Sequence, residues 1–86
     1  MFAGSKTFIS TNDSVVLFSN DEFVDICGRS FRQDTDVVLA MSGDADSLPV
    51  HVDGCSYSKE KKEIYATFDR EWNQPVRVNY LIVLAG

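Results

Sequence analysis

The stretch FDREWNQPVRVNYLIVLA, residues 68–85, decides the fold predicted for this chain. Its first eight residues form a polar segment that contains two aromatic side chains and ends at Pro75. Apolar and polar side chains then alternate from Val76, and residues 81–85 are apolar at every position. Alternation is typical of a strand with one face in water, and a continuous apolar run is typical of a strand covered on both faces. We therefore expect a turn followed by a long strand that ends buried between two layers.

The rest of the chain consists of short β-rich segments separated by clusters of turn residues, which is typical of an all-β protein. The expected strands before the closing one are residues 6–10, 14–19, 36–41, 48–55 and 63–68, with a loop at 28–35 and turns at 42–47 and 58–62. One segment stays open. Phe23 to Cys27 fits either a strand or a single helical turn capped by Asn20, because five residues match both periods.

Two of these segments are expected to pair as a hairpin around the lysine-rich turn at 58–62. Residues 48–55 alternate, with Val50 and Val52 on one face, and residues 63–68 place Ile64, Ala66 and Phe68 on another apolar face. Pro49 cannot donate a hydrogen bond to a ladder, so it predicts a strand start or an edge strand.

No stretch of ten or more residues keeps a helical period, and no linker divides the chain. The predicted fold is therefore all-β, a small antiparallel β-sandwich of six to seven strands formed by residues 1–86 as a single domain. A chain of 86 residues buries only roughly 60 to 65% of the surface that its unfolded form exposes, near the lower limit for a domain. We expect it to bury more by self-association, as a homotrimer.

The charge of the chain argues against nucleic acid as a partner. Eight Lys and Arg face thirteen Asp and Glu, which gives a net charge of −5 that would repel a polyanion. No apolar run approaches the ~20 residues of a membrane span, and the N-terminus lacks the features of a signal peptide. We therefore expect synthesis in the cytoplasm, with no membrane insertion.

The residues that most often bind metals or act as nucleophiles are few and scattered. Cys27 and Cys55 lie 28 residues apart, and His51 is the single histidine. A zinc site needs four grouped Cys and His ligands, and a Ser-His-Asp triad would have to use His51 without a Gly-x-Ser-x-Gly elbow. We expect no metal, no cofactor and no catalytic residues. The two cysteines are interpreted as buried thiols, with a disulfide between neighbouring strands as the alternative.

The turn before the closing strand carries the candidate binding site. Hydrogen-bonding groups and an aromatic face, which carbohydrate recognition requires, occur together in Asp69, Arg70, Trp72, Asn73 and Gln74. The alternative is that Trp72 plugs the end of the sandwich or a subunit interface. We expect this turn to lie at an exposed end of the sandwich or across a subunit seam.

From Asp36 onward the chain resembles the β-sandwich of the H-type lectins and of related domains on bacteriophage tail fibres and spikes. The residues that carry the resemblance are 37–40, 50–52, 64–68, 72–73 and 76–83, which cover about the last fifty residues. The resemblance implies a trimer that binds sugar at subunit interfaces through residues near the Trp turn. By position it assigns that role to Asp69, Arg70, Trp72 and Asn73. Tyr80 stands on the closing strand where the lectins usually have Trp, and it joins the candidate site.

A small acidic sandwich of this kind suits the surface of a virus particle. We expect a non-enzymatic bacteriophage structural protein, an oligomeric virion surface component such as a capsid decoration protein or a tail spike or fibre tip. It would act in particle stabilisation or host attachment. Its partners would be copies of itself, other virion proteins and a host surface glycan. The alternatives are a lectin-like carbohydrate-binding module and a small acidic intracellular inhibitor.

Overall fold

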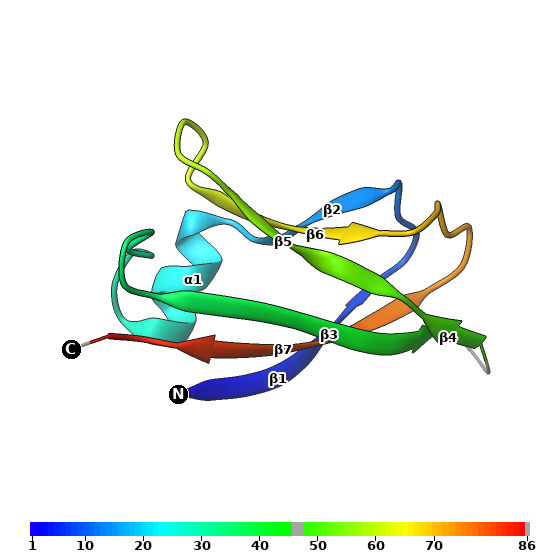
Figure 1. The fold of residues 1–86 in the computed structure, drawn as a ribbon, viewed down its shortest axis with the longest axis horizontal. Helices are drawn as coiled ribbons and strands as arrows, with labels where there is room; N and C mark the ends of the chain where they lie inside the picture. The colour runs from blue at the N-terminus through cyan, green and yellow to red at the C-terminus, as the bar shows by residue number, and fades with distance from the viewer. Residues whose placement is uncertain (46–47, 86) are drawn as a thin grey trace.

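The computed structural model describes residues 1–45 and 48–85, and it contains two antiparallel β-sheets packed face to face (Figure 1). The first sheet has the strand order β1-β7-β3-β4 and the second has the order β2-β6-β5. Their bounds are β1 Phe2–Phe8, β2 Ser14–Phe18, β3 Val37–Ala45, β4 Leu48–Val50, β5 Val52–Ser58, β6 Glu63–Phe68 and β7 Val76–Val83. The helix α1, Asn20–Cys27, has eight residues, less than a tenth of the chain. The all-β prediction is confirmed.

The closing strand β7 lies in the middle of the larger sheet, where it pairs with β1 on one side and β3 on the other. Val76, Val78 and Ile82 point from β7 into the space between the sheets and are fully buried. Ile64, Ala66 and Phe68 do the same from β6, as their alternation predicts. The rest of the buried apolar core consists of Leu17, Phe18, Phe23, Ala45, Val50 and Trp72.

The hairpin around the lysine-rich turn is confirmed. β5 and β6 pair from Ser58 opposite Glu63 to Val52 opposite Phe68. β2 completes the smaller sheet by pairing with β6, and its register shifts between Val16 and Phe18. This shift lets the neighbouring residues Leu17 and Phe18 both point into the core, which a regular alternating strand does not allow.

Residues 20–27 form a helix, which settles the segment that periodicity left open. The cap is Ser19, and the predicted cap at Asn20 is wrong. The Ser19 hydroxyl accepts from the Glu22 backbone N–H, and the Glu22 carboxylate accepts from the Ser19 backbone N–H. Gly28 ends the helix with φ 82°, a left-handed conformation that glycine adopts without strain. The helix covers one end of the sandwich and inserts Phe23 into the core (Figure 1).

The segment 48–55 is divided in two, which corrects the prediction of one continuous strand. β4 belongs to the larger sheet and β5 to the smaller one, and His51 lies at the crossing between them. A register shift between Val52 and Gly54 follows the crossing. Bends and bulges of this kind are how a strand turns a corner from one sheet to the other. Pro49 lies on β4, an edge strand, as predicted.

The prediction of a turn at 42–47 is wrong for residues 42–45, which belong to a strand. β3 continues through Ala45, and a register shift between Met41 and Asp44 bends it against β7. Gly43 makes this close approach possible, because a Cβ atom there would lie 1.5 Å from the Arg77 carbonyl oxygen. Residues 46 and 47 lie outside the described residues.

The predicted loop at 28–35 is confirmed, and a buried carboxylate fixes its end. The Asp36 side chain is fully buried, and it accepts two hydrogen bonds from the Arg29 guanidinium at 2.7 and 2.8 Å. It also accepts from the backbone N–H groups of Arg32 at 2.8 Å and Ala85 at 3.0 Å. One carboxylate therefore joins the loop to the segment that follows β7.

Lys6 points inward from β1, the edge strand of the larger sheet. Its amine donates to the Leu17 carbonyl at 2.7 Å and forms an ion pair with Glu22. The same amine lies 5.5 Å from the centre of the Phe18 ring. These contacts connect β1 to β2 and α1 along one open side of the sandwich.

Candidate functional site

The candidate site lies in the connection between β6 and β7, where the chain turns across one end of the sandwich. Thr11 and Trp72 form a two-way backbone bridge: each residue's N–H donates to the other's carbonyl, at 2.9 and 3.0 Å. This bridge fixes the connection against the turn between β1 and β2. Asp69, Arg70 and Asn73 are exposed on it, which agrees with a loop at the end of the sheets.

The indole of Trp72 is a core side chain. Only 3% of Trp72 is exposed, and the residue packs with the buried apolar cluster. The burial of Trp72 agrees with the alternative that its side chain fills the end of the sandwich, although its polar neighbours are exposed. The backbone bridge to Thr11 holds Trp72 beside the turn between β1 and β2. The register of this bridge is shifted by one residue from that of β1 and β7, in which Phe8 lies opposite Val76.

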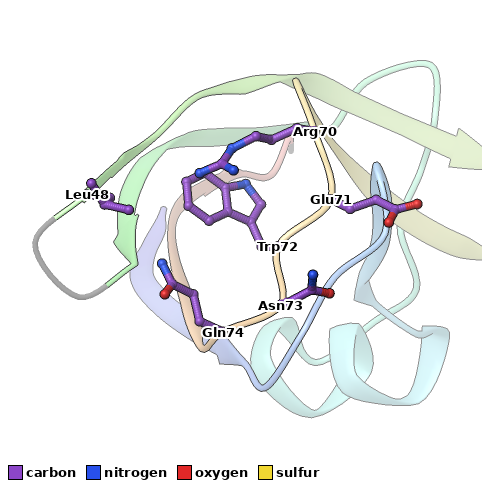
Figure 2. A pocket seen from close by; sticks show the side chains of 6 residues that line it. All are labelled: Leu48, Arg70, Glu71, Trp72, Asn73 and Gln74. Atoms are coloured by element: carbon purple, nitrogen blue, oxygen red, sulfur yellow. The ribbon is translucent and has the colours of Figure 1, made fainter.

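Arg70 covers the outer side of the indole. The centre of its guanidinium lies 3.8 Å from the centre of the Trp72 ring, within the range of a cation–π contact (Figure 2). Within the part of the chain that the structure describes, the indole Nε1 of Trp72 and the hydroxyl of Thr11 are buried without a hydrogen-bond partner. A buried unpaired polar group destabilises a fold by about 1–3 kcal/mol. The apolar packing of Trp72 therefore stabilises the fold by more than these two unpaired polar groups destabilise it.

A hollow of about 250 Å³ lies beside this stacked pair (Figure 2). Its lining residues are Leu48, Arg70, Glu71, Trp72, Asn73 and Gln74. The Glu71 carboxylate points away from the indole in Figure 2, whereas the Gln74 amide lies on the Leu48 side. Asn73 also points away from the indole in Figure 2, so the hollow presents the Arg70 guanidinium and the Gln74 amide beside an apolar wall. These groups suit hydrogen bonding to a small polar ligand, but a sugar ring could stack on the indole only if Arg70 moved aside.

The structure brings three of the five predicted site residues together at this hollow, namely Arg70, Trp72 and Asn73. Asp69 is exposed on the same connection but does not line the hollow. Tyr80 is elsewhere, in the middle of β7, where its ring meets Phe18 edge-on at 4.9 Å between ring centres. The sequence reasoning missed Leu48 and Glu71. Glu71 stands between two of the predicted residues, but no local signal could have found Leu48, because it comes from β4, a different part of the chain.

The thiols and the histidine do not form a common site in the described residues. Cys27 and Cys55 are free and half-buried, and burial raises the pKa of both thiols. A raised pKa keeps a thiol protonated at neutral pH and lowers its reactivity. The Nε2 atom of His51 lies 3.0 Å from the Oδ1 atom of Asp53, and both side chains are exposed.

Residues 1–45 and 48–85 contain no group of three or more side chains placed to hold a metal ion. They also contain no helix long and apolar enough to cross a membrane.

A second candidate surface is the outer face of the larger sheet, which points away from the smaller sheet (Figure 1). Here β3 exposes Val37, Leu39 and Met41 to 47%, 48% and 44%. Val83 on β7 is 37% exposed, and Leu81 is half-buried. The closing strand is thus apolar on both faces, as its sequence indicates, but only its inner face is covered. The prediction that it ends buried between two layers is wrong for the single chain.

Comparisons of this chain with protein-family models, curated proteins and solved structures found no match.

Proposed function

We propose that this protein is a non-enzymatic structural component of a bacteriophage particle. It acts as an oligomer on the virion surface, as a capsid decoration protein or at the tip of a tail spike or fibre, and stabilises the particle or attaches it to the host. The observation that supports this proposal is the exposed apolar outer face of the larger sheet. Exposed apolar surface of this kind marks a site of protein contact. A trimer, as in the domains that the sequence resembles, is the proposed assembly.

The test is the composition of purified particles from the source host. Quantitative mass spectrometry should detect this chain in stoichiometric ratio to a capsid or tail protein, and immunogold labelling should place it on the outside of the particle. Particles that lack the chain, while it accumulates in the lysed host, would contradict the proposal.

A carbohydrate-binding module is the second candidate, and the hollow beside Arg70 favours it. Its guanidinium and amide have the planar geometry that pairs with sugar hydroxyls. A glycan array with the wild-type protein tests this function. Arg70→Ala should abolish any specific signal without unfolding the protein, because Arg70 is exposed. Thr7→Ala, an exposed position on β1, is the matched control. An array without any specific signal would reject the second candidate.

A further inference from the structure

The outer face of the larger sheet is apolar over a continuous area. Strand register places Val37 opposite Val83 and Leu39 opposite Leu81, so the exposed apolar side chains of β3 and β7 lie next to one another across the sheet. Ala3 on β1 lies opposite Leu81 on its other side and extends the area to a third strand. We call this the outer strip, consisting of Ala3, Val37, Leu39, Met41, Leu81 and Val83.

The outer strip is also uncharged, in a chain that is 24% charged residues. The polar residues next to it on the same face, Ser5 and Asn79, are neutral. The first charged residue along β7 is Arg77, which is already paired with Asp44 at 3.0 Å. Charge is thus kept away from the middle of this face.

The lack of charge bears on the kind of partner. A protein with a net charge of −5 attracts a basic partner through acidic side chains and repels a second copy of itself. The outer strip offers no acidic group to a basic partner. It is a surface on which two copies can meet without bringing like charges together. A rotation axis also brings the same patch of every copy together, so an apolar strip meets an apolar strip.

The size of the outer strip suits the centre of an interface. With strands ~4.8 Å apart and ~3.3 Å per residue, three strands over the five residues 79–83 of β7 cover roughly 240 Å². A standard interface buries about 800 Å² on each partner, with an apolar core and a polar rim. The strip would form the core, and Ser5, Thr7 and Asn79 would lie in the rim. This footprint predicts concentration-dependent association.

We propose that copies of this chain associate with their outer strips packed against one another around the threefold axis of the proposed trimer. The inference deepens the proposed function, because it names the surface and the partner of the expected oligomer. The inner face of the same sheet already packs against a second sheet. The outer strip repeats the alternate spacing of apolar side chains on which such packing depends.

The test compares the mass of the wild-type protein with that of Leu39→Glu by sedimentation over a wide concentration range. Leu39 lies in the middle of the strip and is 48% exposed, so the change places a charge in the contact without removing a core side chain. We expect a wild-type multimer whose dissociation constant rises at least about tenfold in the variant. Leu39→Thr, which keeps a strand-forming residue, should weaken association in the same direction. The matched control is Ile9→Glu, an equally apolar position that is 85% exposed and lies off the sheet. It should leave the mass unchanged, and circular dichroism confirms that each variant is folded.

Two results would overturn the inference. In the first, the wild type forms a multimer and both Leu39 variants have the same dissociation constant as the wild type. Association then uses another surface, and the proposed function would stand. In the second, the wild type is a monomer that enters particles, whereas Leu39→Glu does not enter them. The outer strip would then bind a different virion protein. Failure of the proposed function itself is read separately, from the absence of the chain in purified particles.

Discussion

Asp36 offers the sharpest test of what stabilises the fold. Its carboxylate is buried and accepts four hydrogen bonds, two of them from Arg29. Asp36→Asn keeps the volume but replaces one acceptor oxygen with a donor, so an N–H group would face an N–H group. It also leaves the half-buried Arg29 guanidinium without its counter-charge. Hydrogen bonds to charged groups contribute about 1.5–3 kcal/mol each, and breaking a buried pair costs about 3–5 kcal/mol. We expect a loss of about 3 kcal/mol.

Urea unfolding at neutral pH measures this loss directly. For a domain of this size the loss corresponds to a fall in Tm of roughly 12–24 °C. Asp34→Asn is the matched control, because Asp34 is an exposed carboxylate in the same loop. It should change the free energy of unfolding by less than about 0.5 kcal/mol. Equal stability of the two variants would refute the role assigned to Asp36.

The pH dependence of stability gives a second measurement on the same variant. The Arg29 guanidinium, opposed by burial and helped by the N–H groups of Ala85 and Arg32, holds the pKa of Asp36 well below its usual value. The unfolded chain therefore takes up a proton at Asp36 near pH 4, while the folded chain does not. The stabilisation is complete above that pH and is lost as the pH falls toward the folded pKa. Below pH 4 the wild type should lose about 1.4 kcal/mol per pH unit through this group, and Asp36→Asn should lack that slope.

Two further predictions concern packing. Gly43→Ala should destabilise the protein by more than about 3 kcal/mol in urea unfolding, because the added Cβ would overlap the Arg77 carbonyl. Gly54→Ala is the control, since nothing lies within 4 Å of its added Cβ, and it should change the free energy of unfolding by less than about 0.5 kcal/mol. Equal effects of the two variants would contradict the close approach of β3 and β7. Trp72→Ala should lower the free energy of unfolding by about 3–5 kcal/mol, because it removes a buried indole. Arg70→Ala removes only the exposed side chain that lies over the indole, and it should lower the free energy of unfolding by about 1 kcal/mol or less. A fully stable Trp72→Ala protein would show that the indole is not part of the core.

Several strands were predictable from alternation with period two, and those at 14–19 and 36–41 from continuous runs of β-forming apolar residues. The hairpin of β5 and β6 and the buried positions Ile64, Ala66 and Phe68 follow from the alternation alone. The helix was not predictable from periodicity, since its apolar residues are too few. The Ser19–Glu22 capping box could have identified it.

The errors arose where tertiary contacts override local signals. The polar and glycine-containing residues 42–45 continue β3, since residues 43–45 pair with β4 and Asp44 also pairs with Arg77 of β7. The crossing at His51 likewise depends on two sheets that are distant in sequence. At the candidate site, the clustering of Arg70, Trp72 and Asn73 was predictable from their adjacency. The burial of Trp72 was not, because it depends on the bridge to Thr11.

The edges of the two sheets limit how this protein can polymerise. β1 directs the charged Lys6 inward, β4 carries Pro49, and β2 and β5 each contain a register shift. Inward charges, prolines and bulges on edge strands are the devices by which β-proteins block the addition of further strands. Growth of an open fibre by edge pairing is therefore disfavoured on all four edges. Association through a sheet face is different, because a face that is buried in one contact is no longer free to bind another copy. Such association stops at a closed assembly of fixed copy number.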